Sequence, residues 1–241
     1  MKTILLQNYK IYSDDINTIN ISNKKKIINT INAHSYIVAK KDKAFNQALS
    51  TSDILLPDGE GIVLMVKKIR SQNIKKIAGA DIHLKLLELA EKEGLTCFYL
   101  GASENTLKLI NEKVSNTYKN VKFGYYSPPF KDEFSELDTQ TMIQRVNEFQ
   151  PHILFLGMTA PKQEKWAHNN KHQLNTKIIC SIGAVFDFIS ETKKRAPKWI
   201  IEYRLEWLYR SFTAWRLTKR YIYSTPLFLL ELYKLKYFSN K

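Results

Sequence analysis

The chain has very few cysteines, and their positions exclude two kinds of structural support. Its two cysteines, Cys97 and Cys180, each lie within an apolar stretch, at residues 96–100 and 178–182. They lack the paired spacing of a zinc site, and apolar neighbours are typical of small interior side chains in a reduced, cytoplasmic protein. We therefore expect neither a disulfide framework nor a cysteine-bound metal.

Long hydrophobic runs are missing as well. No stretch reaches 18 consecutive apolar residues, and the run at residues 4–6 is too short for a signal peptide. The sequence thus predicts no membrane-spanning helix. Hydrophobic residues still make up 44% of the chain, which is enough for a substantial core and argues against disorder of the whole chain.

Glycine-rich phosphate loops and metal-binding histidine pairs are also absent from the sequence. The eight glycines form neither a GxGxxG sequence nor a P-loop. His168 and His172 have helical i, i+4 spacing, but no Glu directly follows His168 as it does in zinc-protease helices. We therefore expect no ligand site built on these motifs.

Positive charge is in excess, and it is concentrated at one end of the chain. The net charge is +14, and residues 193–241 contribute +9 of it, with twelve Lys/Arg against three Asp/Glu. The same segment holds twelve of the 29 aromatic residues. A basic, aromatic-rich segment suits an anionic partner, namely nucleic acid, a bilayer surface or a diphosphate group.

Apolar stretches alternate with segments of helical period between about residues 27 and 190. The strand-like stretches are 26–31, 54–56, 96–100, 121–124, 153–157 and 178–182, and the helical segments are 33–49, 61–69, 81–93, 104–118, 139–149 and 162–172. This alternation predicts an α/β, Rossmann-like fold with a mainly parallel sheet and helices on both faces. We expect this domain at residues 1–192 and a helical, basic and aromatic appendage at residues 193–241.

Ligands of such sheets bind beyond the carboxyl ends of the strands, which selects a small set of residues. An apolar stretch ends at Gly157, and a turn with Pro161 leads into a helical segment that carries Gln163 and Glu164. These two side chains suit the hydroxyls and amides of a sugar. Gly101 and Asp187 follow two other strand-like stretches and belong to the same predicted set.

Asp58 ends another apolar stretch and is followed by Gly59 and Gly61. The glycines allow a ligand to approach the backbone closely, and a partly desolvated carboxylate at this position has the raised pKa and basicity of a general base. Asp is also a common helix N-cap, and spacing alone leaves these two interpretations equal.

Thr30 and Asn32 form an earlier strand-to-helix turn. They alternate to the same side of an extended segment, so both could face one ligand. Capping of the following helix by Asn32 is the favoured alternative on spacing alone.

Three arginines of the tail complement these polar residues. Arg216 and Arg220 are one helical turn apart and share a helix face, and Arg210 precedes them. Guanidinium groups bind diphosphate bidentately and can stabilise it as a leaving group without a metal. A solvated basic face is the usual alternative, but so many clustered aromatic side chains are costly to solubility on a solvated helix.

Eight short segments occur in a single order over most of the chain. They are Thr30-x-Asn32-Ala33, Leu56-Pro57-Asp58-Gly59, Gly79-x-Asp81, Leu100-Gly101, Gly157-x-x-x-Pro161-Lys162-Gln163-Glu164-x-Trp166, Gly183-x-x-Phe186-Asp187, Arg195-Ala196-Pro197-x-Trp199 and Leu205-Glu206-Trp207-Leu208-Tyr209-Arg210. In this order they resemble the WecG/TagA/CpsF family of bacterial glycosyltransferases. The resemblance implies an inverting enzyme that moves a sugar from a UDP-sugar to a lipid-diphosphate-linked saccharide.

The resemblance also implies a substrate class. Members of the family typically transfer N-acetylmannosamine or its uronic acid to undecaprenyl-diphosphate-linked N-acetylglucosamine, in the synthesis of cell-surface polysaccharide or teichoic acid. It places the general base on Asp58, substrate binding on Thr30, Asn32, Gln163 and Glu164, and diphosphate binding on Arg210, Arg216 and Arg220.

No Asp-x-Asp follows a strand-like stretch, which argues against a sugar nucleotide held through a divalent metal. We therefore expect no metal and no other cofactor. The basic tail is expected to dock on an anionic membrane surface, so that the protein is cytoplasmic and peripherally attached to the inner face of the bacterial plasma membrane.

Two alternatives remain open at this point. The same enzyme class could use UDP-glucose or UDP-glucuronic acid in capsule or exopolysaccharide synthesis. A basic nucleic-acid-binding module could use the same tail, with steeply salt-dependent binding. The second alternative leaves Asp58, Gln163 and Glu164 without a role, so we expect no nucleic-acid partner.

Overall fold

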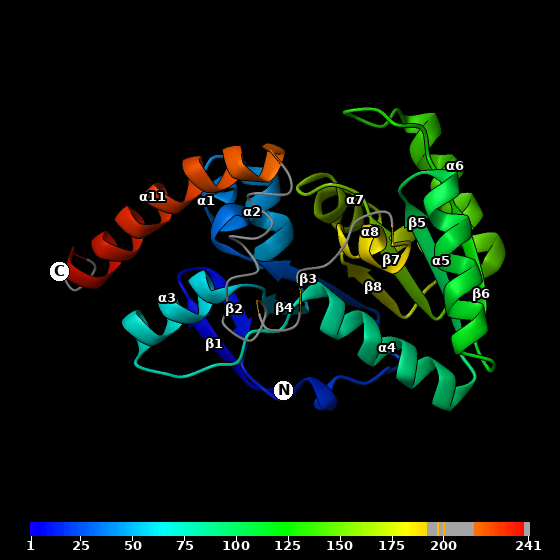
Figure 1. Cartoon of the computed structure of the whole chain (residues 1–241), viewed down its shortest axis with the longest axis horizontal. Helices are drawn as coiled ribbons and strands as arrows, with labels where there is room; N and C mark the ends of the chain where they lie inside the picture. Colours follow the sequence, from blue (N-terminus) through cyan, green and yellow to red (C-terminus); the bar gives the residue numbers. More distant parts are fainter. Residues whose placement is uncertain (192–196, 198–199, 201–214, 239–241) are drawn as a thin grey trace.

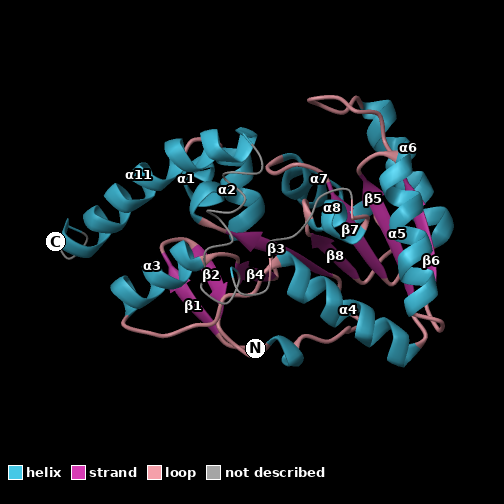
Figure 2. Ribbon diagram, viewed as in Figure 1, coloured by secondary structure: helices cyan, strands magenta, loops and turns pink. Residues whose placement is uncertain are grey.

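A single eight-stranded sheet organises the chain, as seen in a computed structural model that describes residues 1–191, 197, 200 and 215–238 (Figures 1 and 2). The strands lie in the order β1-β2-β4-β3-β8-β7-β5-β6. All neighbours are parallel except β1 and β2, which form an antiparallel pair. Their bounds are β1 Thr3–Leu6, β2 Tyr9–Tyr12, β3 Lys26–Ile31, β4 Ile54–Pro57, β5 Thr96–Gly101, β6 Lys122–Tyr126, β7 Ile153–Gly157 and β8 Ile178–Ser181.

Helices cover both faces of the sheet. Helices α6 and α7 pack on one face with α2 beside α7, and α4, α5 and α8 pack on the other. The bounds are α1 Ala33–Ala39, α2 Lys43–Ser50, α3 Glu60–Arg70, α4 Gly79–Glu93, α5 Glu104–Thr117, α6 Glu136–Phe149, α7 Lys162–Asn170, α8 Val185–Ile189 and α11 Trp215–Phe238, with short 3-10 helices at Ile16–Thr18 and Lys171–Gln173. The predicted α/β fold with a mainly parallel sheet is confirmed.

The central strands are apolar on both sides because helices cover both of their faces. On β3, Ile27 packs on the side covered by α7, and Ile28 packs under the helices of the opposite face. All six predicted strands are present, with bounds within two residues of those expected from the sequence.

Two parts of the fold differ from the sequence expectation. Strands β1 and β2 were not predicted, because each has four residues and they are joined by a two-residue turn at Gln7–Asn8. The single helix expected at 33–49 is two helices. Asp42 separates them, since its side chain accepts a hydrogen bond from the backbone N–H of Phe45 and caps α2.

Helix α11 lies along α1 and also contacts α3, at the left of Figure 1. Phe228 is 3% exposed and meets the ring of Tyr36 edge-on at a centroid distance of 5.8 Å. The helical character predicted for the tail is therefore confirmed at 215–238. The predicted domain boundary at residue 193 lies outside the described residues. Among those described, no helix is long and apolar enough to cross a membrane.

Candidate functional site

The carboxyl ends of the parallel strands converge at one edge of the sheet. From β5 the chain continues to β6, and from β7 it continues to β8, on the opposite side. Neighbouring strands β5 and β7 therefore form a topological switch point, where open α/β sheets bind ligands in the crevice beyond the strand ends. The turns after β3, β4 and β8 lie farther along the same edge.

Asp58 and Asn32 follow neighbouring strands at this edge. The preceding residues, Pro57 of β4 and Ile31 of β3, are paired in register, and the Asp58 backbone N–H donates to the Ile31 carbonyl at 2.9 Å. Gly59 has φ +109°, and a Cβ placed on it would lie 3.7 Å from the Cβ of Asn32. The structure thus brings together the two predicted turns, which lie 26 residues apart in sequence.

Asp58 is half-buried and directly follows β4. Helix α3 begins at Glu60, and the N-cap position is Gly59, one residue after Asp58. Asp58 is therefore not the N-cap residue of α3.

Asn32, in contrast, is the N-cap of α1. Its Oδ1 accepts a hydrogen bond from the Ser35 backbone N–H at 3.0 Å, and the Asn32 N–H donates to the Ser35 Oγ at 2.8 Å. The capping alternative is confirmed. Because the Oδ1 of Asn32 is engaged in the cap, its Nδ2 group is the part of the side chain that could contact a ligand. Thr30 is half-buried on β3, in register with Leu56 of β4.

Gln163 and Glu164 lie in the first turn of α7 and are both buried, with 4% and 2% exposure. The Gln163 Nε2 donates to the Glu164 Oε1 at 2.8 Å. A Cβ on Gly183 would lie 3.4 Å from the Gln163 Nε2 and 3.6 Å from the Met158 carbonyl oxygen. The Gln163 amide thus sits between the turn after β7 and the turn after β8.

Burial changes the acidity of Glu164. Desolvation raises its pKa from 4.5 to about 7, against the opposing effect of the hydrogen bond from Gln163. The Glu164 Oε2 and the Gln163 Oε1 have no hydrogen-bond partner within the described part of the chain. Buried polar atoms normally have hydrogen-bond partners, so these two oxygens mark a polar site whose hydrogen bonds a bound ligand could complete.

Three further buried polar atoms, on the face of the sheet that α7 covers, lack hydrogen-bond partners among the described residues. They belong to Asn29 of β3, Ser181 of β8 and Trp166 of α7. Asn29 and Ser181 follow the paired residues Ile28 and Cys180, so they lie opposite each other and point to the face that α7 covers. Sequence reasoning missed both, although a polar residue inside a buried apolar strand was the available signal.

Gly101 and Asp187, the other predicted binding residues, occupy different environments. A Cβ on Gly101 would lie 2.8 Å from the Gly157 carbonyl, so the lack of a side chain allows the ends of β5 and β7 to approach closely. Gly101 therefore shapes the switch point. Asp187 lies half-buried in the first turn of α8, after β8.

The predicted arginines are described in part or not at all. Arg210 lies outside the described residues. Arg216 and Arg220 lie on α11, one helical turn apart, but their side chains are also outside the described part.

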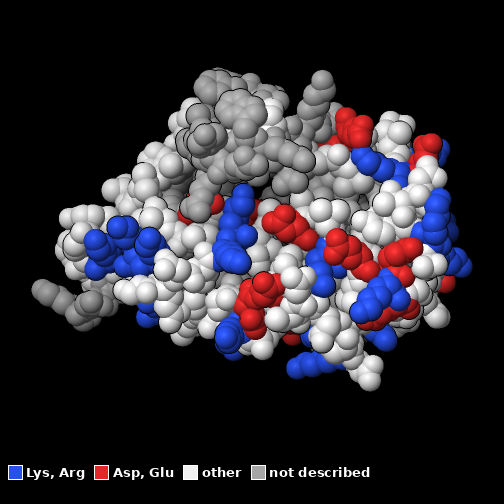
Figure 3. All heavy atoms as spheres, turned by 60° about the horizontal axis from the view of Figure 1, so that its bottom comes forward, with Lys and Arg blue, Asp and Glu red and all other residues white. Residues whose placement is uncertain are grey.

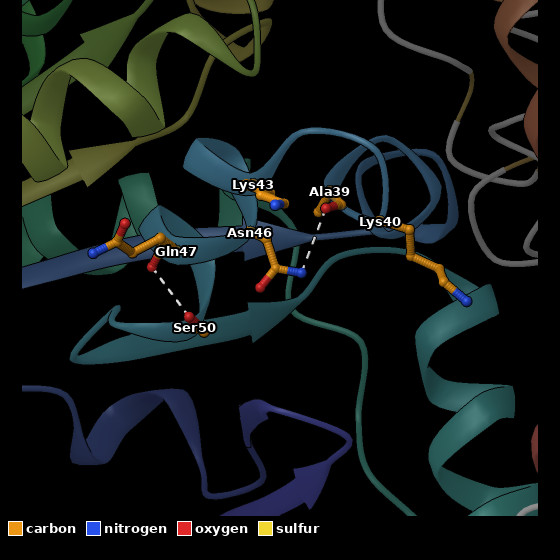
Figure 4. Close-up of a pocket in the computed structure, with 6 residues that line it drawn as sticks. All are labelled: Ala39, Lys40, Lys43, Asn46, Gln47 and Ser50. Carbon is orange, nitrogen blue, oxygen red and sulfur yellow. Dashed lines mark hydrogen bonds between the residues drawn. The ribbon is translucent and has the colours of Figure 1, made fainter.

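A separate surface hollow lies on α1 and α2 and contains none of the predicted residues (Figure 4). It is lined by Ala39, Lys40, Lys43, Asn46, Gln47 and Ser50. Its polar groups are partly engaged, since the Asn46 Nδ2 donates to the Ala39 carbonyl at 3.4 Å and the Ser50 Oγ donates to the Gln47 carbonyl at 3.2 Å. The candidate site is therefore the strand edge and not this hollow.

Comparison with known proteins agrees with the sequence resemblance. A sequence model of the glycosyl transferase WecG/TagA/CpsF family matches residues 7–241. The chain is similar to the N-acetylglucosaminyldiphosphoundecaprenol N-acetyl-beta-D-mannosaminyltransferase of Bacillus subtilis (strain 168), with 32% identity over 209 residues, or 86% of this chain and 79% of the relative. It is also similar to the protein of the same name from Staphylococcus aureus (strain MRSA252), with 25% identity over 217 residues, or 90% of this chain and 83% of the relative.

Proposed function

We propose that this chain, which belongs to the glycosyl transferase WecG/TagA/CpsF family, transfers N-acetylmannosamine from UDP to N-acetylglucosamine carried on a polyprenyl diphosphate. The family makes the chain a glycosyltransferase. The names of the two relatives support this donor sugar and acceptor rather than glucose or glucuronic acid, and they give no support to a nucleic-acid-binding module. The observation that carries the proposal is the family match, which spans every residue of the strand edge described above.

Asp58 is the proposed general base of an inverting displacement. Its carboxylate takes the proton of the acceptor hydroxyl while that oxygen forms a bond to the anomeric carbon. The bond from the anomeric carbon to UDP breaks at the same time, and its electron pair leaves on the UDP oxygen. The half-buried position of Asp58 at the end of β4, next to Asn32, supports this role.

The remaining polar residues of the edge have a positioning role in this proposal. Thr30 and Asn32 stand at the end of β3, and Gln163 stands in the first turn of α7, which follows β7. Their hydroxyl and amide groups can orient the sugars relative to Asp58. Orientation of this kind lowers the barrier without adding charge.

In this proposal, the tail binds the departing UDP and stabilises its negative charge. We propose that Arg210, Arg216 and Arg220 bind a diphosphate and that transfer needs no divalent metal. The absence of an Asp-x-Asp sequence supports this assignment. Turnover that persists unchanged in excess EDTA would agree with it, and restoration of lost turnover by Mg²⁺ or Mn²⁺ would contradict it.

We also propose that α11 docks on an anionic membrane surface. One side of this helix, including Ser224 and Phe228, packs on the core, but the other side exposes apolar side chains: Ile222, Leu229, Leu230, Tyr233 and Tyr237. Lys and Arg side chains gather at the left end of the molecule in Figure 3, where α3 and the end of α11 lie. Exposed apolar side chains on a helix that also exposes Lys234 and Lys236 suit the interface of a bilayer with anionic headgroups.

The reaction itself is tested with a panel of UDP-sugars and a short-chain diphospholipid-linked N-acetylglucosamine acceptor. We expect UDP release with UDP-N-acetylmannosamine and little with UDP-glucose or UDP-glucuronic acid. Omission of the acceptor serves as the control for hydrolysis. Turnover of another donor at a higher kcat/KM would refute the assigned sugar, and absence of turnover with every donor would refute the proposed reaction.

A further inference from the structure

The buried pair in the first turn of α7 points to a role for Glu164 that differs from direct contact with substrate. Its side chain is 2% exposed, and its Oε1 is engaged by the Gln163 Nε2 at 2.8 Å. This carboxylate oxygen is therefore already engaged by the neighbouring amide, which stands between the turns after β7 and β8.

The hydrogen bond also fixes how the Gln163 amide is turned. An amide side chain has two ends of opposite character, and nothing but its partners decides which end faces a given direction. Glu164 engages the Nε2 end, and the carbonyl Oε1 is buried without a partner in the described part of the chain. Gly183 has positive φ, and a Cβ on it would lie 3.4 Å from the Gln163 Nε2 and 3.5 Å from the Oε1, so the glycine leaves this side of the amide without a side chain against it.

We propose that Glu164 is a positioning residue, which holds the Gln163 amide so that its Oε1 accepts a hydrogen bond from a hydroxyl or amide N–H of the sugar substrate. This inference rests on the proposed function for the identity of the ligand. The contact between the Glu164 and Gln163 side chains does not depend on the proposed function. Gln163 thus contacts the substrate, and Glu164 acts through Gln163.

A double-mutant cycle tests this dependence. In the full-length protein, Glu164→Ala raises the KM for the sugar donor roughly tenfold and changes kcat less, since loss of one oriented hydrogen bond costs about that factor. In a Gln163→Ala background, Glu164→Ala has no further effect on KM. Glu164→Gln keeps an acceptor oxygen at the same place and recovers most of the lost affinity. Asn169→Ala, on the exposed side of α7, serves as the matched control. Additive effects on KM would overturn the proposal.

A second measurement tests the contact without relying on turnover. In the folded protein, the NMR signals of one Gln side-chain NH₂ group disappear in Gln163→Ala, which assigns them, and we expect this group to be protected from exchange with water. Glu164→Ala removes the protection, and Glu164→Gln retains it. An unprotected Gln163 amide in the unsubstituted protein would overturn the positioning role. Protection without turnover of any donor would instead refute the proposed reaction and leave the contact established.

Discussion

Phe228 of α11 packs against Gly61, three residues after Asp58. A Cβ on Gly61 would lie 3.3 Å from the Phe228 Cε1 and 3.0 Å from the Ala33 Cβ at the start of α1. The tail helix, the helix after Asn32 and the helix after Asp58 therefore meet at one glycine. Docking of α11 is physically linked to the turn that carries the proposed base.

The first prediction concerns this contact. Phe228→Ala removes a ring that is 3% exposed, so we expect the free energy of unfolding to fall by about 3 kcal/mol, which urea denaturation measures. Phe238→Ala is the matched control, because its ring is 66% exposed and its loss should cost less than about 0.5 kcal/mol. Equal losses in the two variants would show that α11 is not docked as described.

The second prediction concerns the base. Asp58→Asn should lower kcat by about 10²- to 10⁴-fold, because the amide cannot take the acceptor proton. Circular dichroism and the thermal midpoint should remain close to those of the unsubstituted protein. Asp132→Asn, an exposed position in the loop before α6, should leave kcat unchanged. Substantial turnover of the Asp58 variant would rule out its role.

The third prediction follows from the raised pKa of Glu164, about 7 in the folded protein against a reference value of 4.5. Below pH 4.5 both states hold the proton. As the pH rises from 4.5 to 7, the unfolded state releases it first, so the free energy of unfolding falls, by about 3 kcal/mol at most. Glu164→Gln removes this titration. Urea denaturation at pH 5 and pH 8 should therefore show the variant gaining stability relative to the unsubstituted protein at the higher pH, and a constant difference would argue against a buried neutral carboxyl.

The fourth prediction concerns Gly157 at the end of β7. A Cβ there would lie 2.2 Å from the ring of Phe186, which is itself 1% exposed and has little room to move. Gly157→Ala should therefore destabilise the fold by more than about 2 kcal/mol, as measured by thermal unfolding. Gly94→Ala is the comparison, because a Cβ on Gly94 would meet no atom within 4 Å. Its cost therefore comes only from the positive φ of 63°. A smaller effect at Gly157 than at Gly94 would contradict the packing.

The fifth prediction tests membrane docking. Replacement of Ile222, Leu229 and Tyr233 by Ser removes exposed apolar side chains without touching the packed side of α11. Co-sedimentation with vesicles containing anionic lipid should fall several-fold, because interfacial binding scales with buried apolar area. Vesicles of zwitterionic lipid alone should bind the unsubstituted protein weakly. Unchanged sedimentation of the triple variant would exclude this face of α11 as the docking surface.

Parts of the site could be read from local sequence because local interactions decide them. A polar residue directly after a buried strand must stand at the sheet edge, which identified Asp58. Gln163 was identified by the turn with Pro161 that leads from the apolar stretch ending at Gly157 into a helical segment. Sequence left the two interpretations of Asp58, general base and helix cap, equal, because the N-cap position depends on where α3 begins. The structure places that start at Glu60, which makes Gly59 the N-cap residue. For Asn32 the cap interpretation was correct, because Ser35 three residues later completes a reciprocal pair of hydrogen bonds.

The sequence by itself determined the alternation of strands and helices, the family and the residues that follow each strand, because periodicity and order along the chain carry that information. Only the tertiary structure decided which of these residues meet. The strand order places β3 next to β4 and β8, so turns from distant segments share one edge. It also buries Glu164 beside Gln163, where α7 packs on β3 and β8, and desolvation there raises the pKa of the carboxyl to about 7.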